Sequence, residues 1–440
     1  MFAYYSRLAL RSFSRNKALT ALMVLAIGLG IGATMTTLTV FHVLSGDPIP
    51  HKSDRLFYPQ LDPRSKAGYT PGDEPEWQLT RFDAETLLEQ KRGDRQALMT
   101  AGGVAIEPDK QGLAPFSASA RFTTADFFPM FDVPMRAGRA WTAEEDRARA
   151  RVVVISSSLA DRLFDRGEAV GRSLRIDQHE MQVIGVTGDW NLAPRFYDVT
   201  GNSYGGDEEV LVPFWTSREL SLSPSGNMNC WGGGDDDGPP DPEGNHGRNA
   251  NCSWLQYWVE LDSQDKVEAY RKYLADYSEQ QRAAGRFERP TNVRLFDVMG
   301  WLDTNGVVPD DVRLQNWLAL GFLLVCLINT VGLLLAKFMR RASEIGVRRA
   351  LGATRRAIFA QYLIEAAAIG FAGGVLGLAL SQLGLWAVRQ QPVNYAEFIA
   401  FDTTMLLSAL GITTAASLLA GVLPAWRACT VPPAIQLKSQ

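Results

Sequence analysis

The run ALTALMVLAIGLGIGATMTTLTVFHV, from Ala18 to Val43, holds no Lys, Arg, Asp or Glu and is long enough to cross a bilayer as a helix. Three further apolar runs of that kind follow, at Leu314–Ala336, Ile358–Val388 and Thr403–Ala425. Glu365, near the start of the third, is the one acidic or basic residue inside them. The long stretch between the first two runs has the composition of a soluble domain. The sequence therefore predicts a membrane protein of the α+β type, with four transmembrane helices and a large domain between the first and second.

The first apolar run follows a basic segment, as a secretory signal would. It is too long for the apolar core of a signal peptide, and its exit, Phe41-His42-Val43-Leu44-Ser45, offers no small-residue cleavage site. We therefore expect an uncleaved anchor.

Basic residues gather on one side of the predicted spans. The segment before the first span holds four and no acid, at Arg7, Arg11, Arg15 and Lys17. The link between the second and third spans sets seven of them against one acid, Glu344: Lys337, Arg340, Arg341, Arg348, Arg349, Arg355 and Arg356. The tail adds Arg427 and Lys438, whereas the link between the third and fourth spans has only Arg389 against two acids. The positive-inside rule then predicts that both termini are cytoplasmic and that the large domain lies outside, which for the expected location in a bacterial inner membrane is the periplasm.

These features divide the chain into nine expected segments. They are a cytoplasmic amphipathic N-terminal helix (1–17), transmembrane helix 1 (18–44), the periplasmic domain (45–313), transmembrane helix 2 (314–337), a cytoplasmic segment (338–357), transmembrane helix 3 (358–388), a short periplasmic link (389–402), transmembrane helix 4 (403–426) and a cytoplasmic tail (427–440).

The large domain shows a mixed α/β pattern. Strands are predicted where β-branched or alternating apolar residues cluster, at 151–155, 173–176, 181–186, 210–214 and 258–261. Helices are expected over 159–164 and 267–284, and Asp310-Asp311 should open a helix that runs into the second span.

Cys230 and Cys252 flank a loop rich in Gly, Asp, Pro and Asn. In an oxidising compartment they would form a loop-closing disulfide; two unpaired thiols are the alternative.

Two motifs resemble catalytic or cofactor sites but stand in the wrong context. The sequence Gly201-Asn202-Ser203-Tyr204-Gly205 matches a nucleophile elbow, yet loop-like residues flank it where a strand and a helix are required. The glycine series at Gly28, Gly30 and Gly32 matches a dinucleotide fingerprint but lies inside a transmembrane run. Small residues there favour close helix packing, and the same holds for the glycines of the third span, which are expected to share one helix face: Gly370, Gly373, Gly374 and Gly377.

The sequence offers no other chemistry. Its four histidines are scattered without metal-ligand spacing, and the acidic loop Asp235-Asp236-Asp237 lacks the alternation of a calcium loop, so no metal site and no catalytic residue is expected. The formal charge of −4 and the lack of a long basic run speak against a nucleic-acid partner. The dipeptide Gly-Lys of a nucleotide-binding P-loop occurs nowhere, so an ATPase that drives this chain would be a separate polypeptide.

The segment RASEIGVRRALGATRRAIFAQYLIEAAAIGFAGGVLG, Arg341–Gly377, closely resembles the cytoplasmic link and third helix of MacB/FtsX-type ABC permeases. The start LALRSFSRNKALTALMVLAIGLGIG, the middle FTTADFFPMFDVPMRAGRAW and the end GVLPAWRACTVPPAIQLK are similar to the same family. The resemblance is weakest over Leu192–Asn251, where the cysteine-flanked loop resembles an insertion.

The resemblance implies a dimer with a second copy or a paralogue, driven by a separate ABC ATPase that carries the ATP and Mg²⁺; this chain itself would bind no cofactor. It implies export from the periplasm, with a periplasmic adaptor and an outer-membrane channel as further partners beside membrane lipid. An FtsX-like regulator of an envelope enzyme and a lipoprotein-releasing permease are the alternatives.

The residues expected to couple the chain to the ATPase lie in one short basic segment. They are Glu344, Ile345, Gly346, Arg348, Arg349, Gly352, Ala353 and Arg355. A Glu344–Arg348 pair at i,i+4 would stabilise a short helix there, suited to a groove on a cytoplasmic partner. Alternatively, these basic residues only fix the topology and contact anionic lipid head groups.

Overall fold

The computed structural model describes residues 17–430 apart from 111, 165–167, 202, 207, 233–242, 342–343, 345–346, 350, 392–394 and 399–402. The chain forms two compact units, a helical unit from Met1–Gly46 with Val308–Gln440 and a globular domain from Asp47–Val307. The predicted fold class is confirmed, because four long apolar helices and a mixed α/β domain between the first and second are present. The expected N-terminal helix and most of the expected tail lie outside the described residues.

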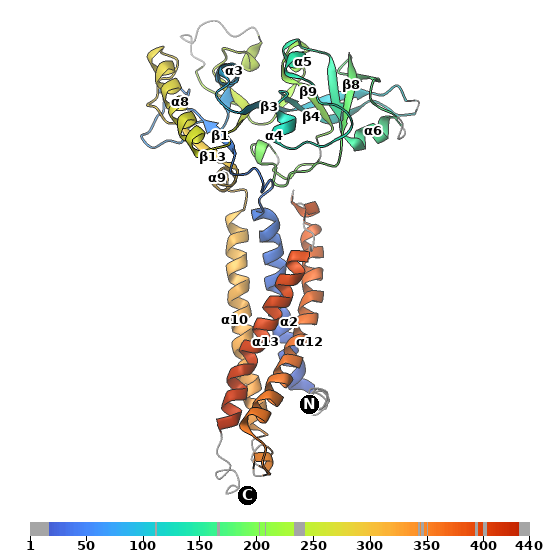
Figure 1. Ribbon diagram of the computed structural model, residues 1–440, viewed down its shortest axis with the longest axis vertical. Helices are drawn as coiled ribbons and strands as arrows, with labels where there is room; N and C mark the ends of the chain where they lie inside the picture. Colours follow the sequence, from blue (N-terminus) through green and yellow to red (C-terminus); the bar gives the residue numbers. More distant parts are fainter. Residues whose placement is uncertain are drawn as a thin grey trace. The chain divides into compact units, whose positions relative to one another are not determined.

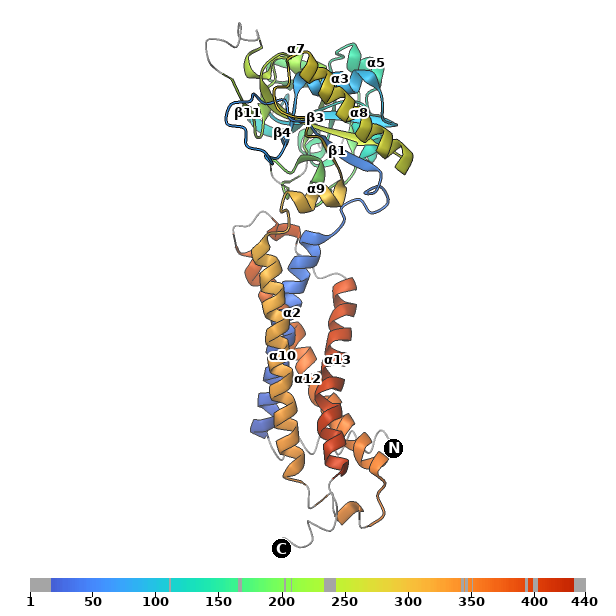
Figure 2. The same cartoon turned by 90° about the vertical axis from the view of Figure 1, so that its left-hand side faces the viewer.

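The helical unit consists of α2 (Lys17–Ser45), α10 (Asp310–Met339), α12 (Arg355–Arg389) and α13 (Thr403–Thr430), with a short 3₁₀ turn η3 (Ala396–Phe398). All four helices contain segments long and apolar enough to cross a membrane. Figures 1 and 2 show them running side by side. Met23, Ile27 and Ile31 of α2 lie at the centre of the bundle, and the Thr34 hydroxyl donates a buried hydrogen bond of 3.1 Å to the Ala319 carbonyl of α10.

The globular domain is built on one mixed sheet of thirteen strands, whose central order is β13-β1-β12-β3-β4-β9-β6-β8-β5. The strands are β1 (Leu56–Gln60), β2 (Leu79–Thr80), β3 (Arg95–Glu107), β4 (Phe116–Thr123), β5 (Met135–Gly138), β6 (Val152–Ile155), β7 (Ser173–Ile176), β8 (His179–Thr187), β9 (Val210–Pro213), β10 (Pro224–Ser225), β11 (Asn229–Cys230), β12 (Cys252–Glu260) and β13 (Arg294–Asp297). Most neighbouring strands pair antiparallel, while β4 pairs with β9 and β6 with β8 in parallel.

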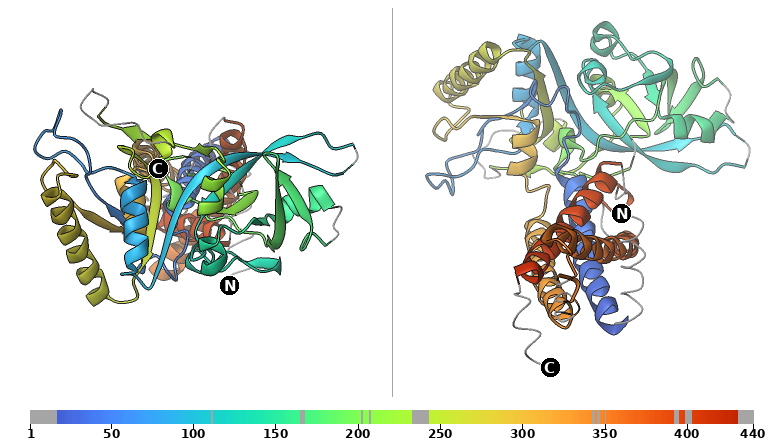
Figure 3. Two further views of the ribbon diagram at one scale, coloured as in Figure 1. Left: turned by 90° about the horizontal axis from the view of Figure 1, so that it is seen from above. Right: turned by 60° about the horizontal axis from the view of Figure 1, so that its bottom comes forward.

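Helices cover this sheet at several places. They are α3 (Arg81–Gln90), α4 (Phe127–Met130), α5 (Ala143–Arg147), α6 (Ser157–Phe164), α7 (Phe214–Glu219), α8 (Gln264–Ala283) and α9 (Val298–Thr304), with 3₁₀ turns η1 (Phe196–Asp198) and η2 (Gly244–His246). Figure 3 shows α3 and α8 toward one end of the sheet and α6 toward the other. The run from β6 through α6 to β8 is a crossover between parallel strands, which explains why the β-branched stretch Val152–Ile155 is buried throughout.

A buried cluster of charges orders the chain between β8 and β9. The Arg121 guanidinium on β4 lies 2.6 Å from the Asp198 carboxylate and 2.6 Å from the Glu208 carboxylate. Burial alone would lower the pKa of Arg121, but these two carboxylates raise it above its usual value. Because β9 pairs with β4 and β6 inside the sheet, the first part of the expected insertion 192–251 belongs to the domain core.

Candidate coupling site in the helical unit

The described residues between α10 and α12 include a short helical turn with a defined end. Glu344 and the residues Val347–Arg349 are helical, while Ile345 and Gly346 lie outside the described residues. The turn closes with two backbone hydrogen bonds, from Ala353 N to Arg348 O at 3.0 Å and from Gly352 N to Arg349 O at 3.1 Å. Gly352 has a φ of +96°, which other residues adopt only with strain. This pattern is the Schellman motif that ends helices.

The next helix starts directly after this motif. Thr354 is the N-cap of α12, and its hydroxyl accepts a hydrogen bond from the Ala357 N–H. A signal that ends one helix is therefore followed directly by a signal that starts the next. Together they leave little freedom between the short turn and α12. Ala353 packs against the core of the helical unit, and Arg355 is the first residue of α12.

Arg348 connects the short turn to α12 through its side chain. Its guanidinium donates to the Glu344 carboxylate at 2.5 Å and to the Gln361 side-chain oxygen at 3.0 Å. The pair with Glu344 is partly exposed, so it contributes only a few tenths of a kcal/mol on its own. Its role is positional, since one side chain holds the turn against the second turn of α12.

Apolar side chains project from the same segment. Leu351 is 83% exposed and Val347 is 53% exposed, although both stand among basic residues. Both side chains are therefore accessible to a partner protein or to lipid.

A buried ion pair joins α10 to α12 nearby. The Lys337 ammonium lies 2.7 Å from the Glu365 carboxylate, and their side chains are 0% and 3% exposed. Arg341 lies 3.8 Å from the other oxygen of Glu365, and the Phe338 and Tyr362 rings pack with centroids 4.2 Å apart. The sequence singled out Glu365 but not its partner on another helix.

The glycines of α12 face two different helices rather than one. A Cβ added at Gly373 or Gly377 would meet the side chains of Ile27 and Ile31 on α2 at 2.6–2.8 Å. A Cβ at Gly370 or Gly374 would collide with Ser417 and Thr413 on α13. The two pairs are offset by three residues, and this rotates them to neighbouring faces of the helix.

The glycines of α2 also lie at helix contacts within this chain. A Cβ at Gly28 would stand 2.8 Å from Leu376 of α12, and one at Gly32 would stand 2.8 Å from Leu380. Gly30 faces α10, where a Cβ would meet Leu323 at 3.0 Å. Close helix approach is thus what these glycines permit.

The two cysteines singled out in the sequence lie in the globular domain and not in the helical unit. Cys230 of β11 and Cys252 of β12 pair across two antiparallel strands and are joined by a disulfide bond. The bond closes the loop that contains residues 233–242.

Comparison with known families matches both parts of the chain. The MacB-like periplasmic core domain matches residues 20–277, and the FtsX-like permease C-terminal domain matches residues 316–433. The second match contains most of α10, the short turn, α12 and α13.

Individual relatives agree with these matches. A macrolide export ATP-binding/permease protein MacB from Azoarcus sp. (strain BH72) is 23% identical over 440 residues, 99% of this chain and 59% of that protein. The protein of the same name from Rhodopirellula baltica is 26% identical over 254 residues, 57% of this chain and 35% of that protein. This chain therefore spans well under two thirds of the length of these relatives.

Among solved structures, the periplasmic region of MacB from Actinobacillus actinomycetemcomitans overlaps 59% of this chain and 96% of its own length, at 14% identity and a TM-score of 0.37. The periplasmic core match alone covers more than half of the 440 residues, and the FtsX-like match accounts for the coupling segment and the last two helices. The chain therefore belongs to the MacB/FtsX-type permeases of ABC transporters.

Proposed function

We propose that this chain is a non-catalytic permease subunit whose globular domain lies outside the cytoplasm and drives export when a partner ATPase binds and hydrolyses ATP with Mg²⁺. The observation that carries the proposal is the short turn between α10 and α12, which exposes Leu351 and Val347 among arginines. An apolar anchor ringed by basic side chains suits a hydrophobic groove with an acidic rim on a soluble partner.

The connections of this turn support force transmission into the bundle. Its Schellman end, the Thr354 cap and the Arg348–Gln361 hydrogen bond hold it against α12. The Lys337–Glu365 pair ties α12 to the end of α10. A partner that displaces the turn would therefore shift α10 and α12 as units instead of unwinding the chain between them.

The charge distribution supports the orientation in this proposal. Basic residues concentrate around the turn, whereas the link after α12 is poor in them, and the positive-inside rule places the richer side in the cytoplasm. The family relationship favours two permease copies per complex, with a periplasmic adaptor and an outer-membrane channel as further partners.

The proposal is tested by a photo-reactive amino acid at Leu351 in the full chain in its native membrane. We expect ultraviolet light to cross-link position 351 to a protein that carries a P-loop, and Ala replacement of Arg348 and Arg349 to reduce the yield. The matched control is the same amino acid at Trp386, which is also exposed (61%) but stands near the other end of α12. Capture of the P-loop protein equally at both positions, or at neither, would refute the assignment.

A further inference from the structure

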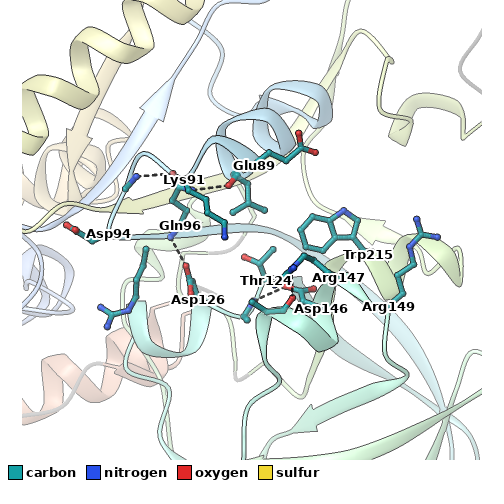
Figure 4. A pocket seen from close by; sticks show the side chains of 15 residues that line it. Glu89, Lys91, Asp94, Gln96, Thr124, Asp126, Asp146, Arg147, Arg149 and Trp215 are labelled. Atoms are coloured by element: carbon teal, nitrogen blue, oxygen red, sulfur yellow. Dashed lines mark hydrogen bonds between the residues drawn. The ribbon is translucent and has the colours of Figure 1, made fainter.

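The globular domain contains a cavity of about 570 Å³ that the coupling function leaves unexplained. Its walls come from the end of α3, the start of β3, the turn after β4, α5 and Trp215 of α7. This volume lies within the range of small-molecule sites in proteins. Figure 4 shows Asp146, Thr124 and Trp215 at one end of the cavity and Lys91 with Gln96 at the other.

Asp146 is the least ordinary residue of this cavity. It is only 3% exposed, and one carboxyl oxygen accepts a hydrogen bond of 3.0 Å from the Ala125 N–H. The other oxygen, Oδ1, is buried and has no hydrogen-bond partner among the described residues. A buried acceptor without a partner costs free energy, and a ligand that donates to it removes that cost.

A second carboxylate, Asp126, lines the other end of the cavity, below Gln96 in Figure 4. Asp126 accepts the Gln96 N–H at 3.0 Å through one oxygen and lines the cavity. Three arginines that line the cavity are engaged with other acids: Arg95 with Glu260, Arg147 with Glu144 and Arg149 with Glu219. Asp94 is paired with Lys266, and Glu89 and Lys91 lie at the α3 end of the cavity. Arg95 also attracts the Asp126 carboxylate, whereas none of these ion pairs includes Asp146.

We propose that this cavity binds a small molecule that carries a basic amine on an apolar body, with the ammonium at Asp146 and the body against Trp215 and Leu88. An ammonium group donates up to three hydrogen bonds, one of which would satisfy Asp146 Oδ1. The aromatic ring and the leucine side chain supply the apolar contact that such sites use for most of their area. The inference goes beyond the coupling function, because binding to the domain requires no ATPase.

The affinity should depend on pH in a definite direction. Burial raises the pKa of Asp146 to about 7, with Asp126 adding to the effect. An ammonium prefers the ionised carboxyl, so affinity rises as the pH increases through that value. Between pH 6 and pH 8 the ionised fraction of a group with this pKa changes about tenfold, while the amine stays charged.

The test is equilibrium dialysis of radiolabelled tryptamine against the full chain in lipid nanodiscs, with empty nanodiscs subtracted. N-acetyltryptamine is the matched probe, since it keeps the ring and lacks the charge. We expect saturable binding of one tryptamine per chain, at least tenfold weaker binding of the acetylated probe, and about tenfold higher tryptamine affinity at pH 8 than at pH 6.

One variant locates the site, and a second is a control. Asp146→Asn keeps an oxygen for the Ala125 N–H; it should weaken tryptamine binding at least tenfold and flatten the pH dependence. Glu268→Gln, on the exposed face of α8, should bind as the parent does. Absence of saturable binding, equal binding of both probes, or unchanged binding by Asp146→Asn would overturn the proposal.

Discussion

Replacing Lys337 by Met should destabilise the helical unit far more than removal of a surface charge would. The substitution leaves the Glu365 carboxylate, 3% exposed, without the ammonium that lies 2.7 Å away. Loss of one partner from a buried ion pair typically costs about 3–5 kcal/mol. Arg341, at 3.8 Å, still offsets part of the charge, so we expect the lower end of that range, about 3 kcal/mol.

The double variant distinguishes this reasoning from a simple packing defect. With both Lys337 and Glu365 replaced by Met, no uncompensated charge is buried, and stability should return to within about 1 kcal/mol of the parent. Arg341 then loses its partner, but its side chain is 18% exposed and turns to water. The pair should therefore show a large coupling free energy in a double-mutant cycle.

The assay is equilibrium unfolding in mixed detergent and dodecyl sulfate micelles, followed by circular dichroism. Arg356→Met serves as the control, because it removes an exposed cation from the first turn of α12 and should change stability by less than about 0.5 kcal/mol. The reasoning is refuted if Lys337→Met lowers the free energy of unfolding no more than the control does. It is also refuted if the loss in the double variant equals the sum of the losses in the two single variants.

Three other perturbations give definite expectations. Gly374→Ala places a Cβ in collision with Thr413 and should cost about 1–3 kcal/mol in the same unfolding assay, while Gly411→Ala, where a Cβ meets nothing within 4 Å, should not destabilise. Cys230→Ser opens a disulfide that spans 22 residues and should lower the free energy of unfolding of the globular domain by about 3 kcal/mol; a melting temperature equal to that of the parent would contradict this. Burial raises the pKa of Asp146 to about 7, above its unfolded value near 3.9, so the folded domain holds a proton that the unfolded chain releases. The free energy of unfolding should therefore fall by up to about 1.4 kcal/mol for each unit by which the pH rises between pH 4 and 7. This contribution should vanish in Asp146→Asn.

Apolar runs made the helical unit predictable. A span needs only length and hydrophobicity, and the bounds of α2, α10 and α12 lie within a few residues of the expected ones. In the domain, the short β-branched runs at Val152 and Val210 were equally visible, because strands buried on both faces are apolar throughout.

Other elements gave no such signal. Strand β3 contains two adjacent glycines and no regular alternation, and its place in the sheet depends on pairing with β4 and β12. Helix α3 buries Arg81, Asp83 and Glu85, which a pattern of apolar residues does not anticipate. Those side chains are accommodated by ion pairs with residues far away in the chain, such as Arg286 with Asp83.

The candidate site shows the same division. The family-like pattern indicated which residues form the coupling segment, but not that Gly352 ends its helical turn. The partner of Glu365 and the helix that each glycine faces depend on how α12 packs against α2, α10 and α13. Sequence spacing fixes positions on one helix but not the rotation of that helix against its neighbours.

The central claim is that an ATPase acts on the segment between α10 and α12, and the most direct measurement is ATP hydrolysis by the complex purified from its native membrane through a tag on this chain. We predict that a P-loop protein co-purifies and hydrolyses ATP, and that Ala replacement of Glu344, Arg348 and Arg349 lowers its yield or its activity while Arg389→Ala leaves both unchanged. A complex that contains no P-loop protein even after cross-linking, or one whose yield and hydrolysis are indifferent to these replacements, would contradict the account.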